Sequence, residues 1–100
     1  MTTAYIIGNR KKIGSEREFK KAEKHLKNFF LEAFNPKEEH ATVLMLADYD
    51  EQQAQKLFEN YMLSCDMVFV LTGWELSSEA TAELRLAKKM KMPIGFQRWE

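Results

Sequence analysis

The sequence predicts one α/β domain, residues 1–100, in which helices enclose a mainly parallel sheet of four or five strands. Segments with strand and helix patterns alternate along the 100 residues. The apolar run Met67–Leu71 is continuous rather than alternating, which is typical of a strand buried on both faces of a parallel sheet. No stretch rich in Pro, Gly or Ser divides the chain, so we expect a single cooperative unit.

The first strand and the first helix are predicted near the N-terminus. Tyr5-Ile6-Ile7 is a β-favouring run that ends at Gly8. Ser15 and Glu18 have the spacing of a capping box, which predicts that a helix begins at Ser15. Apolar residues then recur at helical spacing, at Phe19, Ala22, Leu26, Phe29, Phe30 and Ala33.

The middle of the chain contains one segment that the pattern leaves open. Pro36 disfavours a helical residue before it, so we expect a short second strand near 33–35. The apolar segment 42–47 is too short for periodicity to choose between strand and helix. Asp50 and Gln53 form a second capping-box pattern and predict the next helix. Its apolar stripe comprises Ala54, Leu57, Phe58, Tyr61 and Met62.

A final helix and strand complete the alternation. Ser77 or Ser78 is a good N-cap for a helix that Pro93 ends. The residues expected to point inward are Ala80, Leu84, Ala87 and Met90. Residues 94–99 alternate enough to predict a last strand.

The composition excludes several classes of function. Fifteen Lys and Arg balance fifteen Asp and Glu, so we expect no nucleic acid polymer as a partner. The apolar runs are far shorter than the roughly 20 residues of a membrane span. Cys65 is the only cysteine and no secretory signal pattern is present, so we expect a cytoplasmic protein. We expect no metal and no cofactor, because His25, His40 (in an expected Glu-rich loop), Asp48 and Asp50 form no ligand set.

Candidate ligand-binding residues follow two of the predicted strands, because ligands of open parallel sheets bind beyond the carboxyl ends of the strands. They are Gly8, Asn9, Arg10 and Lys11 after the first strand and Gly73 and Trp74 after the central one. The basic loop is suited to a phosphate, although a solvated loop is the other interpretation. The Trp74 side chain could stack on a base or cover the edge of the sheet.

A longer motif spans residues 64–87. A Cys-Asp pair begins the apolar strand, Gly-Trp-Glu-x-Ser follows the strand, and an Ala, Glu and Ala pattern occupies the next helix. The matching residues are Cys65, Asp66, Gly73, Trp74, Glu75, Ser77, Ala80, Glu83 and Ala87. Tyr5 and Gly8 in the first strand and Asn35-Pro36 after the second fit the same pattern. Over nearly its whole length the chain resembles a family of small phage and bacterial proteins related to nucleoside 2-deoxyribosyltransferases.

This resemblance implies a flavodoxin-like or Rossmann-like three-layer sandwich and an enzyme that cleaves or transfers the N-glycosidic bond of a nucleoside or its 5′-monophosphate. Glu83 resembles the nucleophile of the related enzymes, Tyr5 a tyrosine beside that carboxylate, and Ser77 a residue that lines the sugar pocket. Arg10 loosely resembles the arginine of a loop that holds the 5′-phosphate in a related nucleotide N-glycosidase. The resemblance also implies a homo-oligomer, with pockets completed across the interface.

Three positions depart from the family pattern. Ser77-Ser78-Glu79 stands where relatives have Ser-x-Gly, Gly8-Asn9 stands where they have Gly-Pro, and the most serious departure is at Phe58. Relatives usually carry an Asp, a candidate acid for the leaving base, where this chain has Phe58. Glu59 is adjacent, but one step around a helix is about 100°, so we expect its side chain to point elsewhere. The alternative function is therefore a non-catalytic protein that sequesters or senses a nucleotide. An interaction module that keeps only the fold is a third possibility.

Overall fold

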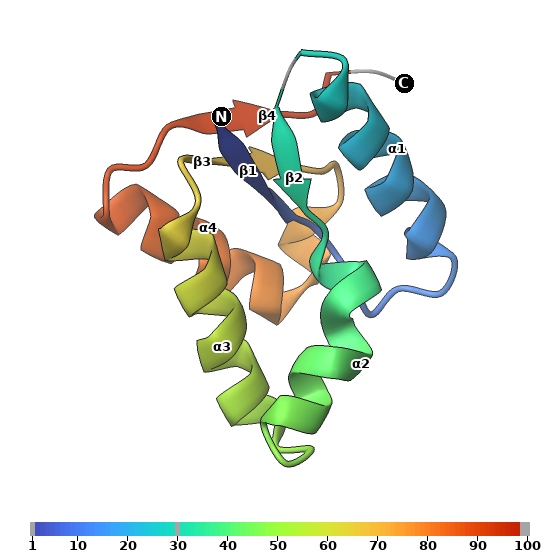
Figure 1. Ribbon diagram of the computed structural model, residues 1–100, viewed down its shortest axis with the longest axis vertical. Coiled ribbons are helices and arrows are strands. Elements are labelled where there is room, and N and C mark those ends of the chain that lie inside the picture. Colours follow the sequence, from blue (N-terminus) through green and yellow to red (C-terminus); the bar gives the residue numbers. More distant parts are fainter. Residues whose placement is uncertain (1, 30, 99–100) are drawn as a thin grey trace.

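In a computed structural model, the chain folds into a four-stranded parallel sheet with helices on both faces (Figure 1). The structure describes residues 2–29 and 31–98. The strands are β1 Thr3–Ile7, β2 Glu32–Phe34, β3 Met67–Val70 and β4 Ile94–Phe96. The helices are α1 Ser15–Lys27, α2 Pro36–Leu46, α3 Glu51–Ser64 and α4 Ser78–Lys89, with a short 3-10 helix, η1, at Trp74–Leu76. The predicted α/β class with a parallel sheet is confirmed.

The strand order β2-β1-β3-β4 defines where a ligand is expected. Every neighbouring pair is parallel, and Ile7 at the end of β1 lies opposite Val70 at the end of β3. The chain runs from β1 outward to β2, then crosses to β3 on the other side of β1. The loops after β1 and β3 therefore diverge at the switch point of a flavodoxin-like sandwich, where such folds bind ligands.

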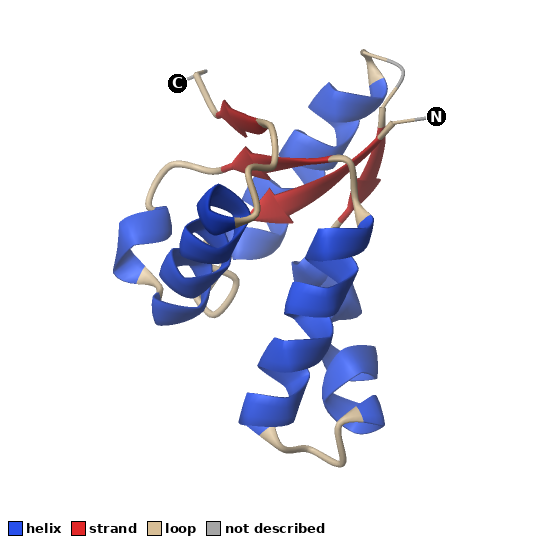
Figure 2. Ribbon diagram, turned by 90° about the vertical axis from the view of Figure 1, so that its left-hand side faces the viewer, coloured by secondary structure: helices blue, strands red, loops and turns tan. Residues whose placement is uncertain are grey.

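The alternation of side chains along β1 divides the core into two clusters. Ala4 and Ile6 pack with α1 on one face of the sheet. Tyr5 and Ile7 face the other way, into a cluster that includes residues of α2, α3 and α4. Figure 2 shows the α2–α3 hairpin extending away from the sheet. Tyr5 is therefore placed on the same side of the sheet as α4, the helix that carries Glu83.

The ends of α1 differ from the prediction. Gly14, with a φ of 82°, precedes the helix and no side chain caps it, so the predicted Ser15 capping box is wrong. The Ser15 hydroxyl instead donates to the carbonyl of Arg10, which holds the loop. The helix ends at Lys27 because the chain must turn back to pair β2 with β1. Phe29 is consequently 63% exposed, Ala33 belongs to β2, and Phe30 lies outside the described residues.

The open segment 42–47 is resolved as helix, since α2 runs from Pro36 to Leu46. Asn35 caps it by accepting hydrogen bonds from the backbone N–H groups of Lys37 and Glu38, and Pro36 occupies the first helical position. The sequence prediction treated the Asn-Pro pair only as the end of a strand. The same pair also begins a helix, and this signal decides the state of the apolar segment that follows.

The later helix starts confirm the predicted caps. The Asp50 carboxylate accepts from the N–H groups of Gln52 and Gln53 at the start of α3. Ser77 Oγ accepts from the N–H of Ala80 at the start of α4. Met90, in contrast, ends α4 and is 55% exposed, so its predicted inward position is wrong. The last strand is also shorter than predicted, and Trp99 lies outside the described residues.

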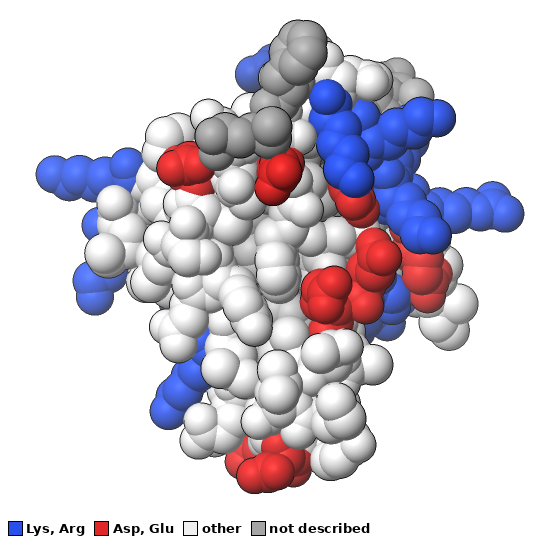
Figure 3. Space-filling view, viewed as in Figure 1, with Lys and Arg blue, Asp and Glu red and all other residues white. Residues whose placement is uncertain are grey.

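On the side seen in Figure 3, basic side chains gather over α1, and acidic side chains lie at the tip of the α2–α3 hairpin and beside α2. Large apolar side chains on the α2–α3 hairpin are exposed, namely Met45, Leu46 and Tyr49. In the described part of the chain, no helix has the length and apolar character needed to span a membrane.

Gly8 follows β1 where the backbone passes close to two buried side chains. A Cβ there would lie 2.9 Å from Leu71 Cδ1 and 3.0 Å from Phe19 Cζ. We expect Gly8→Ala to lower the free energy of unfolding by about 1 to 3 kcal/mol, because both side chains must shift in a packed core. Urea denaturation measures the loss. Gly95→Ala is the control, since its nearest neighbour, Phe69 Cδ1, would be 3.4 Å away; equal losses would contradict the steric argument.

Candidate functional site

A buried ion pair joins the loop after β1 to α4. Arg10 Nη1 donates to Glu83 Oε2 at 2.9 Å, and the two side chains are 2% and 0% exposed. Gln55 of α3 completes the network, because its Oε1 accepts from Arg10 Nη2 at 2.8 Å and its Nε2 donates to Glu83 Oε2 at 3.1 Å. Three segments that are distant in sequence are thus tied together by one guanidinium, one amide and one carboxylate.

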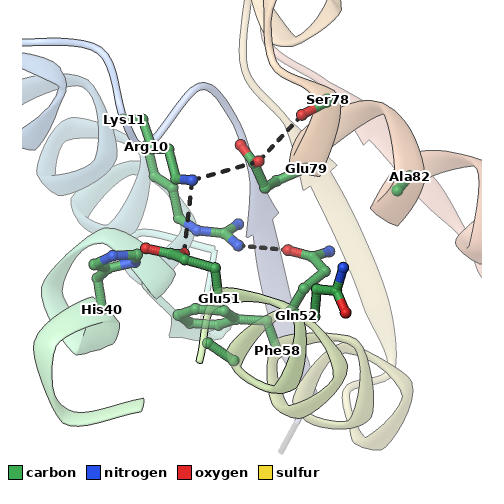
Figure 4. A pocket seen from close by; sticks show the side chains of 11 residues that line it. Arg10, Lys11, His40, Glu51, Gln52, Phe58, Ser78, Glu79 and Ala82 are labelled. Carbon is green, nitrogen blue, oxygen red and sulfur yellow. Dashed lines mark hydrogen bonds and ion pairs between the residues drawn. The ribbon is translucent and has the colours of Figure 1, made fainter. Parts of the chain in front are cut away.

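Two aromatic rings define one side of this network. The Arg10 guanidinium carbon lies 4.2 Å from the centre of the Phe58 ring, which is within the range of a cation–π contact. The ring of His40, from α2, is nearly parallel to that of Phe58, with centres 6.0 Å apart. Figure 4 shows Arg10 above the Phe58 ring and His40 beside it. Phe58 is fully buried and therefore fixes the plane on which the guanidinium rests.

Tyr5 lies fully buried beside the ion pair. Burial, and then the charge of Glu83, raise the pKa of the Tyr5 hydroxyl well above its ordinary value, so the hydroxyl keeps its proton. Within the described residues, Arg10 Nε has no hydrogen-bond partner, and Tyr5 Oη and Glu83 Oε1 have none of full hydrogen-bonding geometry, although Tyr5 lies close enough to Glu83 for an interaction between them to shift the pKa of both groups. Buried polar atoms are nearly always paired, so three atoms without a well-formed partner in one cluster call for an explanation, such as a bound water or ligand.

Burial and charge compete over the ionisation of the pair. Burial raises the pKa of Glu83 above its ordinary value, and the charge and hydrogen bond of Arg10 offset only part of that rise. Burial lowers the pKa of Arg10, but the charge of Glu83 outweighs it and the net change is upward. Arg10 is therefore always charged, whereas Glu83 is held in an environment that also tolerates its protonated form.

The pKa of Glu83 is raised above its ordinary value of 4.5 in the folded protein. The free energy of unfolding should therefore fall as the pH rises from 4.5 through the pKa that Glu83 has in the folded state. In that interval the native state holds a proton that the unfolded chain releases, so deprotonation favours unfolding. His40, whose pKa is lowered by burial and by Arg10, acts in the opposite sense below 6.5. We expect Glu83→Gln to remove the fall and leave the His40 component. Urea midpoints across this pH range test it, and an identical profile in both proteins would contradict it.

A pocket of about 250 Å³ opens over the network. Its lining residues are Arg10, Lys11, His40, Glu51, Gln52, Ala54, Gln55, Phe58, Ser78, Glu79 and Ala82. Lys11 Nζ lies 3.6 Å from a carboxylate oxygen of Glu51 and 3.6 Å from one of Glu79, and so links the first turns of α3 and α4 (Figure 4). No cluster of three or more His, Cys, Asp or Glu suited to a metal ion occurs among residues 2–29 and 31–98.

The structure brings some predicted site residues together and separates others. Tyr5, Arg10 and Glu83 meet in one network, and Lys11 lies at the mouth of the pocket. Gly8 packs against the core and Asn9 forms the following turn, where its carbonyl accepts from the N–H of Lys12. Gly73 and Trp74 line a separate pocket of about 190 Å³, and Ser77 caps α4.

Sequence reasoning missed three residues of this site. His40 is in α2 rather than in the expected loop, and it lines the pocket. Gln55 bridges both members of the ion pair, and it follows Ala54 of the apolar stripe on the flank of α3. Glu59 accepts from the same Gln55 amide at 3.2 Å. Glu59 does not line the pocket, and it reaches the edge of the network only through Gln55, its neighbour four residues earlier on the helix.

The fold and the site together define an α/β domain with a small pocket, lined by both charged and apolar side chains, at the carboxyl end of a parallel sheet. Residues 4–96 match a family described as a domain of unknown function, DUF4406. The chain belongs to this family. No curated protein and no solved structure matches it significantly.

Proposed function

We propose that the pocket binds a nucleoside or nucleoside 5′-monophosphate and that Glu83 acts on its N-glycosidic bond, by hydrolysis or by transfer of the 2-deoxyribosyl group. The observation that carries this proposal is the fully buried Glu83 carboxylate, which is paired with Arg10 directly behind the pocket that the Arg10 side chain lines. Buried carboxyl groups with a shifted pKa and a specific charge partner are typical of active sites. The sequence motif around Glu83 points to the same chemistry.

The proposed reaction has two displacement steps. The Glu83 carboxylate attacks the anomeric carbon, and the C–N bond breaks with its electron pair on the base, which takes a proton from water. Water or a second base then attacks the same carbon and releases Glu83. Only the ionised carboxylate can attack, and Arg10 favours that form. Phe58 has no proton to give, so we expect base release to be slow unless the base leaves easily.

The groups around the pocket fit a phosphate-bearing ligand. Arg10 and Lys11 come from the loop after β1, and His40 borders the same space. A volume of about 250 Å³ suits one small polar molecule rather than a polymer. We also propose, from the sequence, that the protein is cytoplasmic.

The direct test is incubation of the purified protein with deoxynucleosides and their 5′-monophosphates, with chromatography of the free base. We expect release by the wild type, loss of release in Glu83→Gln, and reduced release in Tyr5→Phe, because the buried Tyr5 hydroxyl lies close to the Glu83 carboxylate. Glu32→Gln, at the exposed start of β2, is the matched carboxylate control. Release by Glu83→Gln at the wild-type rate would refute the role of Glu83.

A second candidate function is a non-catalytic nucleotide binder. The observation that favours it is the position of Phe58, which supports the guanidinium that covers Glu83 and leaves no acid at that place. This alternative predicts binding of a deoxynucleoside monophosphate, measured by calorimetry, with no base released on prolonged incubation. Base release that depends on Glu83 would exclude it.

We also propose that the protein forms a homo-oligomer. Met45, Leu46 and Tyr49 are exposed at the α2–α3 hairpin, and exposed apolar surfaces often mark interaction sites. We expect light scattering to give a mass above 11.8 kDa and Leu46→Glu to shift the protein toward monomer. A monomer at high protein concentration would contradict this.

A further inference from the structure

We propose that Arg10 is a displaceable cover on Glu83, and that an oxyanion on the incoming ligand opens the site by drawing the guanidinium away. The inference rests on the site described under the proposed function, but it does not require turnover. In this proposal the Arg10 guanidinium binds either the Glu83 carboxylate or the oxyanion of the ligand.

The first step of the argument is that Glu83 is out of reach. Its side chain has no exposed surface, and it is absent from the lining of the 250 Å³ pocket. Arg10, Gln55 and Phe58 do line the pocket, so the pocket ends at the guanidinium and not at the carboxylate. Glu83 Oε2 already accepts two hydrogen bonds, from Arg10 and from Gln55. A ligand can touch this carboxylate only after the Arg10 side chain has moved.

The second step is that the side chain can move while the loop stays in place. The Arg10 carbonyl accepts from Lys37 Nζ at 2.6 Å and from the Ser15 hydroxyl at 3.3 Å, which fixes the backbone. The guanidinium is held by its two Nη atoms and by the Phe58 ring, and its Nε has no hydrogen-bond partner in the described structure, which leaves one donor for a ligand. An oxyanion can accept two parallel N–H bonds from a guanidinium, a geometry that includes Nε and that the single contact with Glu83 Oε2 does not use.

The third step is that Glu83 and Arg10 each have other polar groups nearby after they separate. Gln55 Nε2 continues to donate to Glu83 Oε2, and the Tyr5 hydroxyl lies close to the same carboxylate. On the ligand side, Lys11 is held only by two exposed ion pairs of 3.6 Å, which are weak and easily rearranged around an anion. A neutral nucleoside offers Arg10 only uncharged acceptors, which compete poorly with the Glu83 carboxylate. The cover therefore selects for ligands that carry an oxyanion, such as a 5′-phosphate.

The exposure of Glu83 can be measured directly by its modification with a carbodiimide and an amine, followed by peptide mass spectrometry. Inorganic sulfate serves as the oxyanion probe, with chloride at equal ionic strength as its control and exposed Glu32 as the internal reference. We expect sulfate to speed the labelling of Glu83 about tenfold relative to Glu32. Equal labelling in sulfate and chloride would overturn the proposal.

Two variants test whether the Arg10 side chain itself protects Glu83 or only stabilises the fold. Arg10→Met should label rapidly at Glu83 without sulfate and show no response to it. Arg10→Lys, which cannot hold Glu83 and Gln55 together, serves if Arg10→Met does not fold and should label at an intermediate rate. Continued protection of Glu83 in a folded variant would overturn the proposal. Because labelling needs no catalysis, sulfate-dependent exposure without base release would support the cover and refute only the enzymatic function.

The phosphate dependence of binding distinguishes a ligand-borne oxyanion from free anions in solution. Calorimetry should show that deoxyribose 5-phosphate binds at least tenfold more tightly than deoxyribose to the wild type. Arg10→Met should lose most of that difference. Equal affinity of the two sugars for the wild type, with a response to sulfate alone, would mean that Arg10 binds free anions and would overturn its role in ligand selection.

Discussion

Replacing Arg10 with Ala should lower the free energy of unfolding by about 3 to 5 kcal/mol at neutral pH, the largest effect expected for a single polar side chain of this protein. The change leaves the Glu83 carboxylate buried with only the amide of Gln55 to compensate it. It also removes the donor that holds Gln55 Oε1 at 2.8 Å. Urea denaturation followed by circular dichroism measures the loss.

The control for this prediction removes both charges at once. Arg10→Met combined with Glu83→Leu should cost far less than Arg10→Ala alone, because no buried charge is left unpaired. The deficit of Arg10→Ala should also shrink as the pH falls, because the native state then binds a proton on Glu83 more tightly than the unfolded chain does. If the single and double variants were equally unstable at every pH, the loss would come from packing and not from charge.

The fold was predictable because its signals are local and agree with one another. The continuous apolar run of β3 and the caps at Asp50 and Ser77 each indicated the element that the structure contains. The errors occur where a local signal competes with sheet pairing. Ser15 and Glu18 have capping-box spacing, but Gly14 takes the cap position and Ser15 binds the Arg10 carbonyl. Which residue occupies the cap position of α1 depends on the geometry of the preceding loop and not on the spacing of Ser15 and Glu18 in the sequence.

The site was only half predictable from the sequence. The motif located Glu83 and Tyr5, and the position of Arg10 after β1 indicated a ligand-facing loop. The contact between Arg10 and Glu83 joins residues 73 positions apart, which no local pattern encodes. Gln55 and His40 look like ordinary helix residues until α2 and α3 are packed beside the loop. Phe58 was treated as a lost acid, whereas in the structure it supports the guanidinium.

Phe58 should therefore matter for stability and for the site together. We expect Phe58→Ala to lower the free energy of unfolding by about 3 to 5 kcal/mol, because the ring is fully buried. The same change removes the surface under the Arg10 guanidinium, so Glu83 should become easier to label in the absence of sulfate. Phe58→Leu should retain more of the packing and cost less, yet it should also loosen Arg10 because it has no π face.

A phenylalanine on the other face of the sheet separates these two effects. Phe69 is nearly buried and packs with α1, away from the ion pair. Phe69→Ala should destabilise the protein by a comparable amount, while the labelling of Glu83 in the folded protein stays at the wild-type rate. If Phe69→Ala and Phe58→Ala exposed Glu83 equally, exposure would follow general loosening of the core. If only Phe58→Ala did so, the ring is part of what keeps the guanidinium on the carboxylate.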